Sequence, residues 1–379
     1  MSTLELAEFV LPGHPDRICD RIADLLVDAA CARDPRSLVG VEVALHREAV
    51  LVTGCVTTDP VLTEPEVARL VEQALVEAGY RGGWARPTPR LWLDLRLEPL
   101  TDELRHLRGC SDDQAICVGW AGGLREHGYL PAAHRLAYLA ARRLGELREA
   151  AGFGPDGKVL VAVEDGQIAS LSVSVQHRPA VDTVALYRLG AEVARSIGLS
   201  ELDRVLVNGG GDFDVGGPDG DNGLSGKKLV VDAYGPTVPI GGGAWCGKDP
   251  HKVDRLGALR ARQLALRAVQ RGLGSEARVE LGWRPGDERP GHVQLVVDGR
   301  GCELACVGPI DLGIEASWRE LDLDAIRWAE RSDGSWFQRP APWNPISDCA
   351  RTLHRRVPVS ERGQSATSTD TSKRPALSI

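Results

Sequence analysis

Glycines, lysines and aspartates alternate between positions 211 and 255, and this segment holds the side chains best suited to chemistry. Glycine turns let backbone N–H groups approach an anion closely. Asp221 and Asp254 could hold a divalent metal ion beside the lysines. A long surface loop would explain the glycines alone, but the lysines favour a site for a polyphosphate and its metal. These lysines are Lys227, Lys228, Lys248 and Lys252.

Residues 242–249 nearly match a P-loop, and two positions depart from it. A P-loop has Ser or Thr after its lysine, because that hydroxyl binds Mg²⁺. Here Asp249 follows Lys248, and Pro250 comes next. Proline removes a backbone N–H where a phosphate-binding helix would begin. We therefore do not predict a P-loop.

A second candidate segment runs from Gly13 to Asp20. His14 could donate a hydrogen bond to a leaving oxygen, and Asp16 could bind a metal. The alternative is a plain helix start, with Asp16 as N-cap and Asp20 in the first turn. Both interpretations can hold together.

Composition excludes several classes of protein. The chain has 379 residues and a net charge of −8, which argues against general nucleic-acid binding. No apolar run approaches the ~18 residues of a membrane span, and no signal peptide is visible. The nine cysteines form no CxxC pair, so free thiols in a reducing cytoplasm are the simplest interpretation.

Hydrophobic periodicity predicts a mixed chain of helices and strands. Helices are expected over 18–33, 64–79, 131–150, 181–197 and 254–272. Strands are expected over 39–45, 49–58, 91–97, 158–163, 169–175, 229–234, 277–282 and 292–298. We expect an α+β fold of three similar sheet-plus-helix domains: 1–125 (discontinuous), 126–235 and 236–350. Residues 351–379 are expected to be a disordered, mildly basic, solvated tail.

Three motifs together resemble the S-adenosylmethionine synthetases (methionine adenosyltransferases). The family's G-H-P-D-K corresponds to Gly13–Arg17, and its G-G-P-x-G-D-x-G-L-T-G-R-K to residues 216–228. Its G-G-G-A-F-S-G-K-D-P-x-K-V-D-R corresponds to residues 241–255, with Trp245 and Cys246 substituted. Weaker similarity extends from about residue 8 to 345, so the chain is identified as a divergent member of this family.

The resemblance implies a reaction in which the sulfur of methionine attacks C5′ of ATP. The whole triphosphate leaves and is then hydrolysed to pyrophosphate and phosphate. Two Mg²⁺ ions and K⁺ would assist. The implied fold has three similar α+β domains in a pseudo-threefold arrangement. The implied assembly is a homodimer, or a dimer of dimers, with its active sites between subunits.

The resemblance also implies residue roles. His14 would lie near the C5′–O bond that breaks, and three catalytic lysines would contact phosphates: Lys158, Lys228 and Lys248. ATP would be bound by Arg17, Asp113, Asp156 (ribose), Phe213 (adenine) and Lys227. The acceptor would face Cys55, Glu98, Asp221 and Lys252. Mg²⁺ would be held by Asp16 and Asp254, and K⁺ by Glu42.

The acceptor side departs from the family pattern. Cys55 stands where the family has a glutamate that binds the methionine ammonium, and a thiol cannot pair with an ammonium as a carboxylate does. Glu98 stands near the position of a family glutamine. The default acceptor is methionine. The alternatives are a methionine analogue or other small nucleophile, or a non-catalytic, nucleotide-binding partner of a true synthetase.

Overall fold

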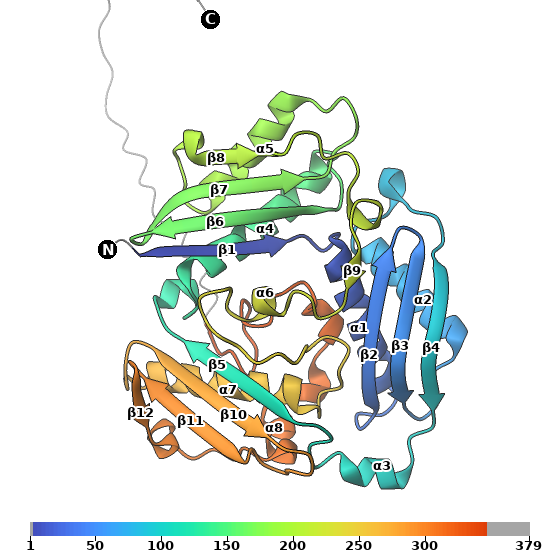
Figure 1. Ribbon diagram of the computed structural model, residues 1–379, viewed down its shortest axis with the longest axis vertical. Helices are drawn as coiled ribbons and strands as arrows, with labels where there is room; N and C mark the ends of the chain where they lie inside the picture. Colours follow the sequence, from blue (N-terminus) through green and yellow to red (C-terminus); the bar gives the residue numbers. More distant parts are fainter. Residues whose placement is uncertain (1–2, 347–379) are drawn as a thin grey trace, which may run out of the picture.

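The computed structural model describes residues 3–346, and in this range the chain forms three four-stranded sheets, each backed by helices (Figure 1). The sheets surround a central segment that carries the short helix α6 (Leu229–Ala233) (Figure 1). This arrangement confirms the expected α+β fold. The expected tail at 351–379 lies outside the described residues.

The first sheet has the order β1-β6-β7-β8. Its strands are β1 (Leu4–Val10), β6 (Gly157–Glu164), β7 (Gln167–Val175) and β8 (Val205–Val207). Helices α4 (Ala132–Ala150) and α5 (Thr183–Ser196) pack on one face and close a core around Phe9, Val161 and Leu144. The other face exposes Leu6 and Leu160.

The second sheet has the order β4-β3-β2-β9. Its strands are β4 (Arg90–Glu98), β3 (Ala49–Thr57), β2 (Leu38–His46) and β9 (Gly223–Leu224). Helices α1 (Pro15–Cys31) and α2 (Glu64–Glu77) belong to this unit. The strands alternate, because Val50, Val52 and Val56 are buried while Leu51 and Trp92 are exposed. One face of this sheet therefore remains open.

The third sheet has the order β12-β11-β10-β5. Its strands are β12 (Arg300–Cys302), β11 (His292–Val297), β10 (Ala277–Trp283) and β5 (Ala115–Ala121). Helix α7 (Val253–Gln270) packs so closely on β5 that a Cβ at Gly119 would lie 2.0 Å from the carbonyl carbon of Ala261. Helix α8 (Ile314–Glu320) follows. The cores of the second and third sheets form one continuous cluster.

Short elements complete the fold. Helix α3 (Asp102–Leu107) connects the second and third sheets. Single 3₁₀ turns span Gly82–Trp84, Arg125–His127, Leu202–Arg204, Gly217–Asp219, Leu304–Val307, Leu323–Ala325 and Trp328–Glu330. Among residues 3–346, no helix combines the length and apolar character needed to cross a bilayer.

Two local predictions were wrong. Residues 229–234 form helix α6 rather than a strand, because a short apolar run has no periodicity that separates the two. Its tertiary partners decide: Val231 accepts a hydrogen bond from the buried imidazole of His134 at 2.8 Å, and Asp232 pairs with Arg17. At the start of α1, the N-cap is His14 and not Asp16, which lies in the first turn.

Candidate active site

Helix α1 gathers the glycine-rich segments through four buried or half-buried aspartates spaced four residues apart: Asp16, Asp20, Asp24 and Asp28. Asp16 and Asp20 accept the N–H groups of Leu224 and Gly226 at 3.0 and 2.8 Å. Asp24 accepts the N–H of Gly247 at 2.9 Å. Asp28 accepts two N–H groups at 2.7 and 3.0 Å from the segment near residue 328. One stripe of α1 thus positions both glycine loops and the C-terminal segment.

The sequence suggested metal or phosphate binding but not this ladder of aspartates. The i, i+4 spacing that would have revealed it is present in the sequence. The backbone partners come from loops about 200 residues or more away along the chain, as the separation of 208 residues between Asp16 and Leu224 shows. Local periodicity carries no information about such contacts.

Arg17 lies in a buried ion cluster rather than at an open surface. Its guanidinium pairs with Asp20 and Asp232, and all three side chains are almost fully buried. Burial raises the pKa of both carboxyls, and the charge of Arg17 opposes that rise. Asp20, Asp232 and Cys246 lie close enough together to suggest a metal site. The guanidinium already neutralises that group, so we interpret it as a structural cluster.

His14 and Asp16 form the centre of a first functional group, together with Lys227 and Lys228. His14 Nδ1 accepts the N–H of Asp16 at 3.2 Å, so the ring proton belongs on Nε2, which is free to donate. Burial lowers the pKa of His14 to about 4, and the nearby charges of Lys228 and Lys158 act in the same direction. His14 is therefore a neutral hydrogen-bond donor near pH 7.

Asp16 is fully buried, yet it stays ionised. Lys228 Nζ lies 2.9 Å from its Oδ2, and Lys227 Nζ lies 3.6 Å from its Oδ1. Burial alone would raise the pKa of Asp16. The hydrogen bonds from Lys228 and from the N–H of Leu224 outweigh that effect and hold the pKa below its usual value. We call His14, Asp16, Lys227 and Lys228 the His14 group.

Asp156 and Lys158 extend the His14 group onto β6. Asp156 Oδ2 accepts the N–H of Gly217 at 2.7 Å, which fixes the start of the central glycine loop. Burial raises the pKa of Asp156 to about 6, whereas the charge of Lys158 opposes the rise. The charge of the exposed Lys158 thus acts on both Asp156 and His14, and Lys158 pairs with Val10 in the register of β1 and β6.

Two predicted residues of the glycine loop lie beside Asp156. The N–H of Phe213 donates to His177 Nε2 at 2.9 Å, and its half-buried ring packs against Gly216, where a Cβ would lie 2.9 Å from Cε2. Asp221 is exposed and accepts the N–H of Asn222 at 2.8 Å. The charge of Asp221 also contributes to the raised pKa of Asp156.

A second group of charged residues lies at and just before the start of α7. We call Lys248, Lys252, Asp254 and Asp112 the Lys248 group. Lys248 Nζ lies 2.7 Å from Asp254 Oδ2. Lys252 Nζ lies 2.5 Å from Asp112 Oδ2, a partner that the sequence did not reveal. Gly243, in the loop before Lys248, has no room for a side chain in this arrangement, because a Cβ there would lie 1.7 Å from Asp254 Oδ1.

Asp249, which excluded a P-loop, has a structural role. Its buried carboxylate pairs with Arg108 and accepts the N–H groups of Val39 and His251, each at 2.9 Å. Helix α7 begins only at Val253, so no helix N-terminus follows Lys248 directly.

The open face of the second sheet carries three further predicted residues. Glu42 Oε2 accepts a hydrogen bond from Ser225 Oγ at 2.5 Å, beside a cavity of about 240 Å³. Cys55 lies between Gly40 and Arg96 in the strand register. Glu98 ends β4 opposite Thr57 and is exposed. Sequence reasoning missed Arg96, although it precedes Glu98 by two residues and so shares its face.

Asp113 remains apart from these groups. It lies just before β5, is exposed, and accepts the N–H of Gln114 at 2.7 Å. Within residues 3–346, no hydrogen bond or ion pair joins Asp113 to another predicted site residue. Within the same residues, no hydrogen bond or ion pair joins the His14 group to the Lys248 group.

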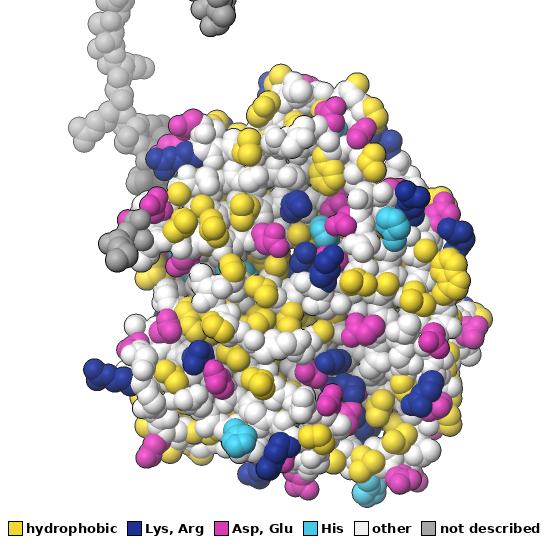
Figure 2. Space-filling view, in the orientation of Figure 1, with side chains coloured by type: hydrophobic (Ala, Val, Ile, Leu, Met, Phe, Trp, Pro, Cys, Tyr) yellow, Lys and Arg dark blue, Asp and Glu magenta, His cyan; other side chains and the backbone are white. Residues whose placement is uncertain are grey.

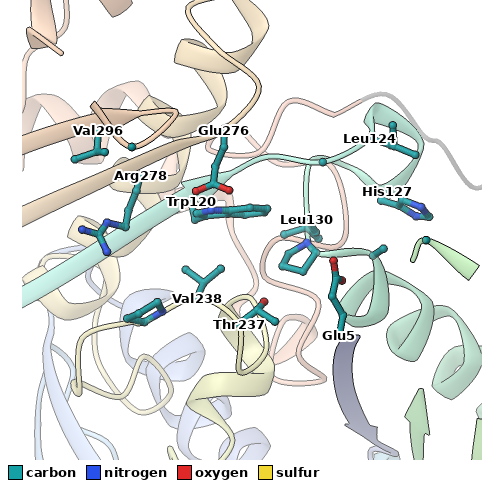
Figure 3. Close-up of a pocket in the computed structure, with 16 residues that line it drawn as sticks. Glu5, Trp120, Leu124, His127, Leu130, Thr237, Val238, Glu276, Arg278 and Val296 are labelled. Atoms are coloured by element: carbon teal, nitrogen blue, oxygen red, sulfur yellow. The ribbon is translucent and has the colours of Figure 1, made fainter. Parts of the chain in front are cut away.

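A larger cavity, of about 690 Å³, opens between the first and third sheets (Figure 3). Trp120, Glu276 and Arg278 line it from the third sheet, and Glu5 from β1 (Figure 3). None of the predicted site residues lines this cavity. Cavity size therefore does not identify the candidate site, and the clustered lysines and aspartates do.

Known proteins resemble this chain in sequence and in fold. Models of the S-adenosylmethionine synthetase N-terminal and C-terminal domains match residues 2–86 and 215–340. The S-adenosylmethionine synthase of Thermosynechococcus vestitus is 34% identical over 343 residues, covering 79% of this chain and 81% of that protein. That of a Parafrankia species is 33% identical over 375 residues, covering 88% and 93%. A solved structure, titled as an unusual S-adenosylmethionine synthetase from Campylobacter jejuni, matches with a TM-score of 0.81 at 25% identity, covering 92% of this chain and 98% of that one.

The three-sheet fold and these relatives define a transferase enzyme. The chain belongs to the S-adenosylmethionine synthetase family.

Proposed function

We propose that this chain makes S-adenosylmethionine from ATP and methionine. The sulfur lone pair forms a bond to C5′, the C5′–O bond breaks, and its electron pair leaves with the triphosphate. The triphosphate is then hydrolysed to pyrophosphate and phosphate. The observation that carries the proposal is the His14 group, in which a buried neutral imidazole and a buried carboxylate lie beside two more accessible lysines.

His14 is suited to the oxygen that leaves C5′. Its free Nε2–H can donate a hydrogen bond to that oxygen as negative charge develops there. The lowered pKa keeps the ring neutral, and because Nδ1 accepts the N–H of Asp16, the single ring N–H is on Nε2. Lys228, Lys227 and Lys158 would stabilise the triphosphate charge, and Lys248 would do so from the Lys248 group.

The carboxylates fit the Mg²⁺ ions that the family implies. Asp16 and Asp254 offer hard oxygen donors, and in this structure an ammonium occupies the cation position beside each, at 2.9 and 2.7 Å. Bound Mg²⁺ would supply positive charge to the phosphates. Asp254→Asn should abolish Mg²⁺-dependent turnover while the protein stays folded; full activity would exclude the ligand role. We assign K⁺ to the neighbourhood of Glu42 and Ser225.

We further propose a homodimer, or a dimer of dimers, in which the His14 group of one subunit faces the Lys248 group of the other. Two observations support this assembly. No hydrogen bond or ion pair joins the two groups within the described part of one chain, and the open sheet faces expose apolar residues: Leu4, Leu6, Leu51, Trp92, Ile116, Leu160 and Val293. Figure 2 shows apolar side chains spread across the face seen in Figure 1. Mixing inactive His14→Ala and Asp254→Asn subunits should restore part of the activity.

The domain division at residues 125, 235 and 350 and a cytoplasmic location are also proposals. All eight cysteines of the described part of the chain are free thiols, in keeping with a reducing compartment.

A second candidate function is the same transfer to a methionine analogue, and the presence of Cys55 rather than a carboxylate on the acceptor side favours it. The non-catalytic alternative has less support, because the intact His14 group retains every element of a charged reaction centre. Incubation with ATP, Mg²⁺, K⁺ and methionine, followed by mass spectrometry for S-adenosylmethionine, tests the main proposal. ATP that stays intact with every thioether would support the non-catalytic alternative.

A further inference from the structure

Three residues form a row across the open face of the second sheet. Gly40 of β2 lies opposite Cys55 of β3, and Cys55 lies beside Arg96 of β4. All three belong to the outward set of their strands, because Val39, Val41 and Val56 are buried on the other face. The row crosses the sheet at one height, so a single small ligand can touch all of it.

The row lies directly beside the Lys248 group. Gly40 forms a β-bridge with Lys248. A Cβ at Gly40 would lie 3.5 Å from Lys252 Cε and 4.0 Å from its Nζ, so the Lys252 side chain lies over the row. A ligand held by this row is therefore within reach of Lys252, which the sequence assigned to the acceptor.

Arg96 is the charged residue of the row, and no carboxylate of the described residues forms an ion pair with it. Its Nη2 donates to Cys55 Sγ at 3.8 Å, a long and weak hydrogen bond to sulfur. Within residues 3–346, no carboxylate lies in ion-pair distance of Arg96, whereas Lys252 is already paired with Asp112. Asp94 and Glu98 lie on the same face of β4 as Arg96, each two residues from it, which is roughly 7 Å along the strand.

We propose that Arg96 is the specificity residue for the acceptor, and that it selects thioether carboxylic acids whether or not they carry an amino group. This inference rests on the proposed adenosyl transfer. The planar guanidinium fork matches a carboxylate bidentately, which a lysine cannot do. Cys55 offers an ammonium no countercharge, so the amine contributes little at this point of the site. In the transfer, the thioether sulfur forms the bond to C5′ and becomes a sulfonium, and the triphosphate leaves with the electron pair.

The test compares three acceptors with ATP and Mg²⁺: methionine, 4-(methylthio)butanoate, which lacks the amine, and 3-(methylthio)propylamine, which lacks the carboxylate. The sulfonium products are measured by mass spectrometry. We expect both acids to have kcat/KM values within about tenfold of each other, and the amine to be about 10- to 100-fold poorer, as expected when a charged hydrogen-bond partner is lost.

Arg96→Gln removes the charge and keeps a side chain of similar reach. It should lower kcat/KM for both acids by about 10- to 100-fold, leave KM for ATP unchanged, and narrow the gap between acids and amine. The matched control is Arg90→Gln, on the same face of the same strand, whose guanidinium lies over Trp92. The control should change none of these values.

The possible outcomes separate the two claims. If sulfonium products form but Arg96→Gln leaves the preference for acids unchanged, the role of Arg96 is wrong and the adenosyl transfer stands. If none of the three acceptors yields a sulfonium with ATP, the proposed function itself is wrong. Arg96→Lys keeps the positive charge but not the planar fork. If this variant keeps only part of the preference for acids, while Arg90→Gln keeps all of it, the bidentate role of Arg96 is supported.

Discussion

Replacing Asp24 by asparagine removes one charge from the centre of the α1 ladder. Asp24 Oδ1 accepts the N–H of Gly247 and lies 2.5 Å from Arg255 Nη2, and both side chains are fully buried. The amide oxygen of asparagine can keep both hydrogen bonds, but the guanidinium of Arg255 loses its countercharge. Breaking a buried ion pair costs about 3–5 kcal/mol. Because the hydrogen bonds survive, we expect the lower end, about 3 kcal/mol.

Asp28→Asn is the matched comparison, four residues further along the same stripe. Asp28 accepts two backbone N–H groups, one on each oxygen, and makes no ion pair within the described chain. Burial raises its pKa to about 6, so its charge adds little to stability. The substitution removes one acceptor and should cost about 1–2 kcal/mol.

Urea unfolding followed by tryptophan fluorescence gives both free energies, at one fixed protein concentration because a dimer's stability depends on concentration. The difference between the two variants should be at least ~1 kcal/mol. An Asp28→Asn variant as destabilised as Asp24→Asn would refute the reasoning that the ion pair with Arg255, rather than loop capture alone, gives the ladder its strength.

Three further perturbations probe the site. Gly243→Ala should abolish turnover, because its Cβ would lie 1.7 Å from Asp254 Oδ1. The neighbouring Gly242→Ala is the control: its Cβ meets no atom within 4 Å, so this variant should be active. Equal activities of the two variants would contradict this loop geometry. His14 has a folded pKa of about 4, below its unfolded value, so its contribution to stability is present above pH 6.5 and is lost as pH falls towards 4. From pH 7 to 5, wild type should lose about 2 kcal/mol more than His14→Gln in urea unfolding, and parallel losses would show that His14 is not buried as a neutral ring. Cys55→Glu places a carboxylate beside Arg96 and should lower kcat/KM for 4-(methylthio)butanoate about tenfold, while KM for ATP stays unchanged. An unchanged kcat/KM for this acid would show that Cys55 does not belong to the acceptor site.

Much of the fold followed from periodicity in the sequence. The alternation of Val50, Val52 and Val56 with outward residues predicted β3, and the helical spacing of apolar residues from Ile18 predicted most of α1. Periodicity did not predict β1 and β5. Each pairs with a strand that is far away in the sequence, β1 with β6 and β5 with β10. Strand pairing over such distances leaves no local pattern.

The site divides in the same way. The residues His14, Asp16, Lys228, Lys248 and Asp254 lie in sequence motifs, so the sequence could nominate them as candidate site residues. Asp112 and Arg96 belong to no motif, and only the packing of α7 and the parallel register of β4 bring them to Lys252 and Cys55. Contacts of this kind depend on tertiary packing, which a single sequence does not encode locally.

In the proposed reaction the bond broken in ATP is C5′–O, and sulfur replaces the oxygen. Turnover of ATP with methionine in H₂¹⁸O shows which bond breaks. The proposed reaction gives S-adenosylmethionine free of label, and each turnover places one ¹⁸O in either the pyrophosphate or the phosphate formed by triphosphate hydrolysis. ADP or AMP as the nucleoside product, with label in the phosphorus-containing products, would place the attack at phosphorus and contradict the proposed adenosyl transfer.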